Sequence, residues 1–276
     1  MTNKIKILFL CQEMAPYLEL TEISKITRHL PQAMQENGYE IRVLMPRFGC
    51  INERRNKLHE VIRLSGMNIV VDENDNPLII KVASIQGAKM QVYFLDNEEY
   101  FHRKQVFNDN KGKFFADNDE RTIFFCKGVL ETVKKLGWSP DIIHCHGWMS
   151  SLVPMYVKTA YKNDPTFKNS KVVYSVYGND FAGNLGDGFY KKALTGSMNE
   201  KDAEIFGSGD AASLHQGALT YSDGAILAAE SISSDIEKQL KGASMPVSTI
   251  TSTEDFENYS AFYEEILQED MEEVEA

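Results

Sequence analysis

Two histidines flank a cysteine in the segment His-Cys-His-Gly-Trp-Met, which begins at His144. Residues two apart in an extended strand face the same side, so His144 and His146 could hold one metal ion together. A zinc site needs about four ligands, however, and no other histidine stands at ligand spacing from this pair. Cys145 could be a nucleophile with a histidine as its base, but neighbouring strand residues point to opposite faces. We therefore predict no metal site and no catalytic cysteine, and interpret the histidines as hydrogen-bonded side chains at a strand end.

Three further features stand where the chain is expected to leave a strand. Tyr17 and Trp148 carry aromatic rings, which can stack on a sugar ring or pack against the core, and both interpretations stay open. The glycine-rich segment 177–188 has neither a Gly-x-Gly-x-x-Gly pattern nor the Lys-Ser or Lys-Thr of a P-loop. We interpret it as a turn-rich loop, with a weak saccharide or anion contact as the alternative. The sequence implies no cofactor.

Apolar runs that alternate with helical patterns predict the elements that position these residues. Continuous apolar runs are typical of parallel strands buried on both faces. They occur at residues 5–10, 40–46, 141–145, 171–177 and 224–229. Helical patterns lie at about 22–37, 120–136, 148–161 and 211–222. The predicted fold class is α/β: a Rossmann-like, mostly parallel, doubly wound sheet with a β-rich insertion near residues 60–95.

The carboxyl ends of the predicted strands indicate where a ligand would bind. In open α/β sheets, ligands bind in the crevice beyond these ends. The loops 11–22, 145–150 and 177–188 follow three of the strands. We therefore expect any activity to reside in these loops, which contain the histidine pair and both aromatic residues.

Charge and composition exclude several classes of protein. The net charge is −11, and residues 251–276 hold ten acidic residues and no Lys or Arg, so the rest is nearly neutral. An acidic segment disfavours nucleic acid and anionic membranes as partners. The four cysteines are scattered, and no stretch approaches the roughly 18 apolar residues of a membrane helix. A cytoplasmic protein with reduced thiols is expected.

The acidic segment also carries a helical pattern. Phe256, Tyr259, Phe262, Tyr263 and Ile266 fall on one side of an amphipathic helix. We predict a domain over residues 1–250 followed by an acidic helix or tail over 251–276. The acidic residues are interpreted as a solvated face, with docking onto a basic surface as the alternative.

Motifs in the three loops, taken in order, resemble the amino-terminal half of bacterial glycogen synthases and plant starch synthases. The segment CQEMAPYLELTEI, which begins at Cys11, aligns with S-E-x-A-P-x-x-K-T-G-G-L of that family. HCHGWM aligns with H-x-H-D-W-H, and SVYG with T-V-H-N. ALTYSDGAIL is similar to G-x-x-Y-A-D-x-I-T-x-V-S. The resemblance covers roughly residues 1–240 and implies a single GT-B domain of the amino-terminal type.

The first loop departs from the family pattern at the residues that approach the sugar nucleotide. Glu19 stands at the lysine position, and Thr21 and Glu22 stand at the two glycine positions. A carboxylate in place of an ammonium group beside a phosphate changes attraction into repulsion, of order 4 kcal/mol at about 4 Å in a surface-like dielectric. Thr21 can cap the helix that follows, and Glu22 can supply an anion to its N-terminus. We expect the backbone N–H groups at this helix start to find their hydrogen-bond partners within the chain itself.

The second and third loops depart in the same sense. The family's Asp and active-site His fall on Gly147 and Met149, and its His and Asn fall on Tyr177 and Gly178. Methionine offers neither proton transfer nor a strong hydrogen bond. Family members also continue into a second Rossmann domain that supplies most of the donor-nucleotide site.

These departures predict a glycogen-synthase-like protein that has lost catalysis and acts as a binding or partner-interaction module. We expect a homodimer or a protein partner over the face that the second domain covers in the family, and weak binding of a glucan or sugar nucleotide. The alternative is a glucosyltransferase from ADP-glucose to α-1,4-glucan, with another chain supplying the second domain. The candidate ligand-binding residues are Glu13, Tyr17, His144, His146, Trp148 and Tyr177.

Overall fold

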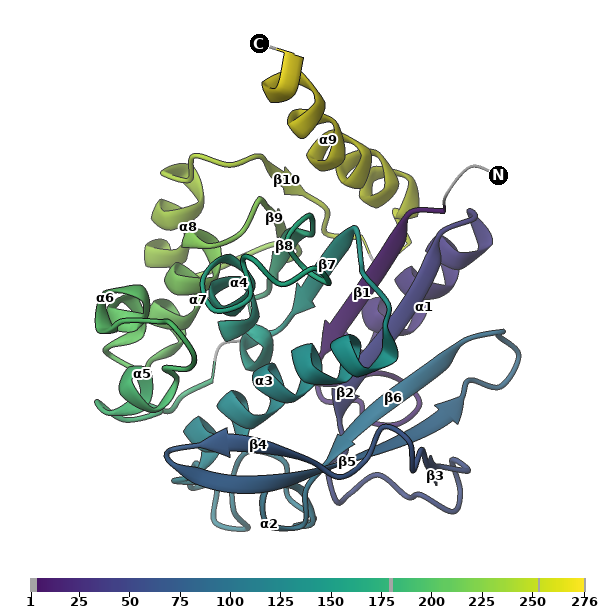
Figure 1. Cartoon of the computed structure of the whole chain (residues 1–276), viewed down its shortest axis with the longest axis vertical. Helices are drawn as coiled ribbons and strands as arrows, with labels where there is room; N and C mark the ends of the chain where they lie inside the picture. The colour runs from purple at the N-terminus through teal and green to yellow at the C-terminus, as the bar shows by residue number, and fades with distance from the viewer. Residues whose placement is uncertain (1–3, 179–180, 253, 276) are drawn as a thin grey trace.

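A ten-stranded sheet forms the centre of the computed structural model, which describes residues 4–178, 181–252 and 254–275 (Figure 1). The strand order is β10-β9-β8-β7-β1-β2-β6-β5-β3, and β4 pairs with β5. The parallel strands are β1 (Lys6–Cys11), β2 (Glu40–Pro46), β6 (Gln91–Asp96), β7 (Ile142–His146), β8 (Lys171–Val176), β9 (Gly224–Leu227) and β10 (Val247–Thr249). The antiparallel strands are β3 (His59–Glu60), β4 (Met67–Val71) and β5 (Asn74–Ser84). The predicted mostly parallel α/β sheet is confirmed.

The β-rich insertion divides into two parts. The strand β6 pairs in parallel with β2 and so extends the main sheet, whereas β3, β4 and β5 add antiparallel strands beyond it. β10 has no counterpart among the predicted strands. It is three residues long, has a polar centre and lies at the end of the sheet, so it lacks the apolar run that marks a buried strand.

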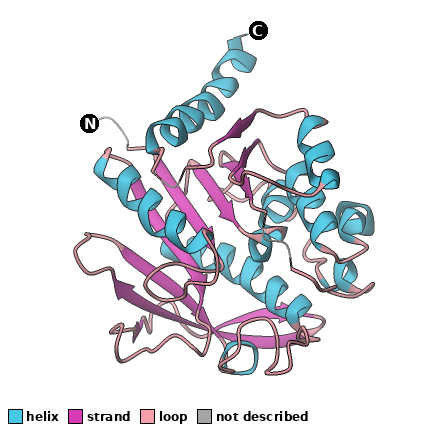
Figure 2. Cartoon of the chain, turned by 180° about the vertical axis from the view of Figure 1, so that it is seen from behind, coloured by secondary structure: helices cyan, strands magenta, loops and turns pink. Residues whose placement is uncertain are grey.

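Helices cover both faces of the sheet. They are α1 (Ile23–Glu36), α2 (Glu98–Phe101), α3 (Asn118–Leu136), α4 (Leu152–Lys158), α5 (Phe189–Lys192), α6 (Glu200–Ala203), α7 (Ala211–Thr220), α8 (Ser234–Lys241) and α9 (Phe256–Glu275), with 3₁₀ turns η1 (Trp148–Ser150) and η2 (Glu204–Phe206). The long helix α3 lies in front of the sheet in Figure 1, while α1 and α9 lie on the face seen in Figure 2. Gly137 follows α3 and takes the left-handed conformation in which helices commonly end. The Ser233 side chain caps α8 by accepting the N–H of Ile236.

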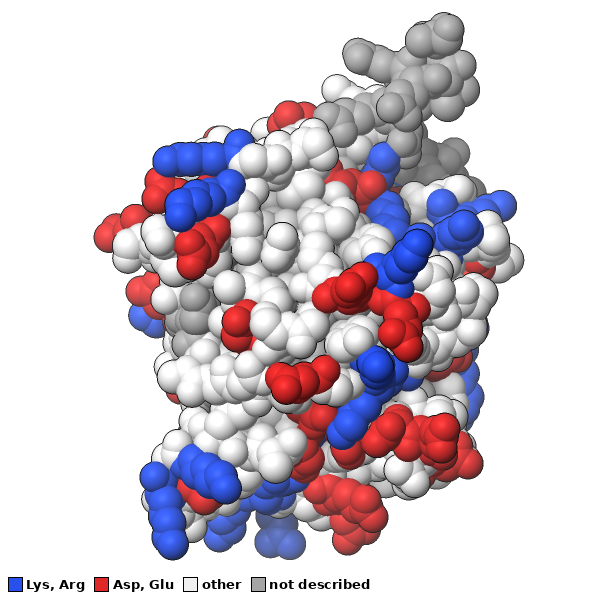
Figure 3. All heavy atoms as spheres, turned by 90° about the vertical axis from the view of Figure 1, so that its left-hand side faces the viewer, with Lys and Arg blue, Asp and Glu red and all other residues white. Residues whose placement is uncertain are grey.

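Most charged side chains lie outside this core, and both signs occur on the face shown in Figure 3. None of the helices in the described ranges is long and apolar enough to cross a membrane. The body of the domain therefore presents a mixed charged surface around a large apolar interior.

The helix α9 packs its predicted apolar side onto the sheet. Tyr259, Phe262, Tyr263 and Ile266 are all buried. A Cβ atom at Gly224, on β9, would lie 2.5 Å from Cδ1 of Ile266, so a side chain there would require α9 side chains to shift. The acidic side chains on the opposite side, such as Glu264 and Glu265, are exposed. Beyond residue 256 the chain therefore contributes to the core as well as to the charge.

We predict that Phe262→Ala lowers the free energy of unfolding by about 3–5 kcal/mol, because it leaves a cavity between α9 and the sheet. Glu264→Ala on the exposed side of the same helix should change it by less than about 0.5 kcal/mol. Urea denaturation of both variants checks this difference. Equal midpoints for the two variants would contradict the docking of α9.

Candidate functional site

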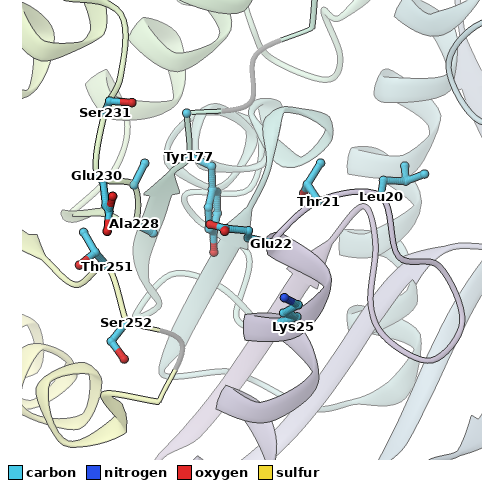
Figure 4. Close-up of a pocket in the computed structure, with 12 residues that line it drawn as sticks. Leu20, Thr21, Glu22, Lys25, Tyr177, Ala228, Glu230, Ser231, Thr251 and Ser252 are labelled. Carbon is cyan, nitrogen blue, oxygen red and sulfur yellow. The ribbon is translucent and has the colours of Figure 1, made fainter.

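The carboxyl ends of the parallel strands open into one cavity of about 740 Å³ (Figure 4). Its walls come from the loop before α1, the end of β8, the segment after β9 and the segment after β10. The lining residues are Leu20, Thr21, Glu22, Lys25, Tyr177, Gly178, Ala228, Ala229, Glu230, Ser231, Thr251 and Ser252. Two of the three predicted loops contribute to it, 11–22 and the described part of 177–188, whereas loop 145–150 is buried. Residues 179 and 180 lie outside the described residues.

Sequence reasoning missed the walls formed by residues 228–231 and 251–252. The signal for the first was present, because residues 224–229 were expected as a parallel strand whose carboxyl end points to the same crevice. The second follows β10, which the sequence does not reveal. Both segments place hydroxyl groups at the cavity, from Ser231, Thr251 and Ser252.

Glu13 holds the loop before α1 in place. Its side chain is fully buried, and Oε2 accepts hydrogen bonds from the backbone N–H groups of Leu20 at 2.8 Å and Thr21 at 2.7 Å. Oε1 accepts the Thr21 hydroxyl at 2.7 Å. The Thr21 hydroxyl oxygen in turn accepts the N–H of Ile23 at 3.2 Å. Both carboxylate oxygens are thus engaged within the loop.

The backbone N–H groups at the start of α1 find hydrogen-bond partners within the chain, as expected. The carboxylate that takes part belongs to Glu13, however, and not to Glu22. Glu22 takes the N-cap position of α1, and its side chain makes no capping hydrogen bond. The carboxylate that accepts the loop N–H groups belongs to Glu13, which lies seven and eight residues before Leu20 and Thr21. Backbone N–H groups before a helix are a common anion-binding arrangement, and here an internal anion occupies them.

The predicted histidine pair lies at the end of β7 and is fully buried. The rings of His144 and His146 are 3.9 Å apart between centroids. His144 shares hydrogen bonds with Tyr263 at 2.6 Å and Ser175 at 2.7 Å, and His146 shares one with Tyr177 at 2.7 Å. Burial lowers the pKa of His146 to about 3. Burial, together with the neighbouring His146, lowers the pKa of His144 well below its usual value.

The other predicted residues are held by packing. Trp148 lies between Phe107 and Phe181, with ring centroids 4.9 and 4.6 Å away. Tyr17 meets the ring of Phe94 edge-on at 4.9 Å, and burial raises its pKa to about 12, which Arg28 opposes. Of the six predicted ligand-binding residues, Tyr177 is the one that lines the large cavity.

Cys145 is fully buried beside the histidines, and burial raises the pKa of its thiol well above the usual value. In the described ranges, no group of three or more His, Cys, Asp or Glu side chains is arranged to hold a metal ion. The charged residues of the cavity itself are Glu22, Glu230 and Lys25, so carboxylates outnumber ammonium groups there.

Two glycines at the site are places where a side chain would not fit. Gly147 has a φ of +81°, and a Cβ atom there would lie 2.6 Å from Oε1 of Gln12. That Gln12 oxygen accepts the N–H of Met149 at 3.3 Å, and Met149 is buried. A Cβ atom at Gly178 would lie 2.4 Å from the carbonyl oxygen of Ser231. At both positions, atoms of neighbouring segments already occupy the space that a side chain would need.

Comparison with known proteins gives this arrangement a family. The family described as the starch synthase catalytic domain matches residues 6–246. The chain belongs to this starch synthase family. A glycogen synthase of Chlorobium luteolum is 41% identical over 173 residues, which are 62% of this chain and 35% of the relative. A glycogen synthase of Chlorobium phaeovibrioides is 36% identical over 223 residues, covering 80% of this chain and 45% of the relative.

A solved structure shares the fold. It is the catalytic domain of starch synthase IV from Arabidopsis thaliana, bound to ADP and acarbose, with a TM-score of 0.66 and 16% identity. The match covers 81% of this chain and 45% of that one. The chain thus spans less than half the length of these relatives from the starch synthase family. The predicted resemblance and the GT-B-type fold are confirmed. The six ligand-binding residues and the partner interface stay predictions.

The close contact at Gly147 gives a prediction. Gly147→Asp, which restores the residue type of the starch synthase family motif, should destabilise the domain by more than about 2 kcal/mol, because backbone strain of about 1–3 kcal/mol is joined by the clash with Gln12. Gly112→Asp is the matched control, since Gly112 has a φ of +80° and no atom within 4 Å of its Cβ position. Thermal unfolding measures both. Gln12→Ala in the Gly147→Asp background should recover part of the lost stability. Equal destabilisation by Gly147→Asp and Gly112→Asp would contradict the claim that Gln12 occupies the space beside Gly147.

Proposed function

We propose that this domain is a non-catalytic member of the starch synthase family, and that its cavity binds an uncharged saccharide such as the end of an α-glucan rather than a sugar nucleotide. The observation that carries the proposal is the start of α1: the Glu13 carboxylate accepts the two backbone N–H groups there, and Glu22, at a glycine position of the family motif, adds a second carboxylate to the cavity. A phosphate at this helix start would have to displace a buried carboxylate that already has three hydrogen bonds.

The charges at the cavity support the same conclusion. Glu22 and Glu230 line it with one ammonium group, that of Lys25. Each carboxylate about 4 Å from a pyrophosphate would cost of order 4 kcal/mol in a surface-like dielectric, less where salt screens it. An uncharged sugar does not meet this repulsion. The hydroxyl groups of Ser231, Thr251 and Ser252 can each donate and accept hydrogen bonds, as a polyhydroxylated ligand requires.

The loss of catalysis is supported by the residues at the family's active-site positions. Met149 stands where the resemblance places the active-site histidine, and it is buried against the core. Gly147 and Gly178 stand where the family has an Asp and an Asn, and neighbouring atoms occupy the space for a side chain. The described residues at these positions therefore offer no general acid, base or sugar-binding side chain.

A second candidate is a glucosyltransferase whose other half comes from additional chain or from another protein. Two findings favour it: the family is described as a catalytic domain, and the glycogen synthases that match are more than twice as long as the matching part. It would require an unrelated group to replace the proton-transfer chemistry that Met149 cannot provide.

A melting-temperature series separates the two candidates. Maltoheptaose should raise the melting temperature, because a ligand at 100 times its Kd adds about 2.7 kcal/mol to the stability of the folded state. ADP-glucose at the same concentration should leave it unchanged, and no ADP should be released in the presence of glycogen.

Two variants test whether the effect comes from the cavity. Ser231→Trp, at the cavity wall, should abolish the shift with maltoheptaose, whereas Ser208→Trp at an exposed position outside it should not. An ADP-glucose-dependent shift, or ADP release that Ser231→Trp abolishes, would support the transferase instead. A failure of maltoheptaose to shift either protein would count against glucan binding.

A further inference from the structure

A buried lysine connects α3 to two other parts of the chain. Lys127 lies on α3 and is 6% exposed. Its Nζ donates hydrogen bonds to the carbonyl oxygen of Val70 at 3.1 Å and to that of Leu194 at 3.3 Å. Val70 belongs to β4 and Leu194 follows α5, and both of these elements contact α3 (Figure 1). One side chain therefore holds the hairpin of β4 and β5, the segment after α5 and the helix α3 together.

No carboxylate pairs with this amine in the part of the chain that the structure describes. β4 has no charged residue. Charged side chains on the other surrounding elements pair with one another: Lys192 with Asp72, Asp119 and Glu120, Lys81 with Asp96, and Lys134 with Glu131. The others are exposed, namely Glu73, Asp75 and Lys191. The contacts of Lys127 are therefore those of a donor to two backbone carbonyl groups.

The number of acceptors matches the uncharged form of the amine. A neutral amino group has two N–H bonds, and the structure provides two carbonyl oxygens. An ammonium group has three N–H bonds, so one of them would have no partner among the described residues. Burying a charge without an opposite charge is also unfavourable. Burial accordingly lowers the pKa of Lys127 from 10.5 to about 8.

We propose that Lys127 is a pH-sensitive link: its uncharged amine holds the β4–β5 hairpin and the segment after α5 against α3, and protonation of the amine weakens that hold. A protonated amine regains hydration only if the hairpin or the segment moves away from α3. None of these residues lines the large cavity. The inference therefore goes beyond the proposed function and holds whichever ligand the cavity binds.

The two acceptor carbonyl groups test the link in the native protein. In protein labelled with ¹³C at the carbonyl carbons of valine and leucine, the signals of Val70 and Leu194 should shift with pH at one common midpoint near pH 8. Both shifts should disappear in Lys127→Met. The proposal fails if either signal of the native protein does not titrate between about pH 6 and 9.5, or if the titration persists in Lys127→Met.

Urea denaturation at a series of pH values measures the strength of the hold. Below about pH 8 both the folded and the unfolded chain carry the proton, so the unfavourable burial of the charge is present in full. Above it the folded domain releases the proton first, and stability should rise with pH. Relative to Lys127→Met, the folding equilibrium constant of the native protein should increase about 25-fold between about pH 7 and 9.5.

Lys135→Met is the matched control. Lys135 lies on the same helix and also donates to a carbonyl oxygen of the insertion, that of Ser65 at 3.2 Å, but it is exposed. Because its charge remains hydrated, the native protein should gain no stability with pH relative to this variant, and Val70 and Leu194 should titrate in it as before. A constant ratio between the native protein and Lys127→Met, or an equal rise relative to Lys135→Met, would overturn the proposal.

Discussion

The arrangement of the cleft depends on the buried carboxylate of Glu13. A fully buried anion is stable only where hydrogen bonds replace its hydration, and here the N–H groups of Leu20 and Thr21 and the Thr21 hydroxyl do so. The same bonds fix the path of the loop that enters α1 and place Thr21 and Glu22 at the cavity. The hydrogen bonds of Glu13 therefore determine both the geometry of the loop and the polarity of the cavity wall.

Other polar groups of the site also find their hydrogen-bond partners within the chain. Gln12, directly before Glu13, fills the space beside Gly147 and accepts the N–H of Met149. The histidine pair is neutral because burial disfavours its charged form, and three of its four ring nitrogens pair with Ser175, Tyr177 and Tyr263. A cleft that is polar at its walls and closed beneath them is the basis on which we propose binding rather than group transfer.

The sequence predicts the fold well because parallel strands buried on both faces have an unmistakable apolar signature, as in residues 5–10 and 171–177. It also predicts that the carboxyl ends of the parallel strands meet at one edge of the sheet. It does not predict that Glu13, rather than Glu22, supplies the anion to the loop, because that depends on how the chain folds back over seven residues. Nor does it reveal the wall at Thr251 and Ser252, since β10 is too short and polar to be recognised. The contact between Tyr263 and His144 joins residues 119 positions apart, which no local pattern encodes.

The most direct test of this account is a crystal structure of the protein grown with millimolar ADP-glucose. The account predicts that the helix start holds no nucleotide and that Oε2 of Glu13 stays within hydrogen-bonding distance of the N–H groups of Leu20 and Thr21. Clear density for a pyrophosphate against residues 19–22, with the Glu13 carboxylate displaced from those groups, would contradict it.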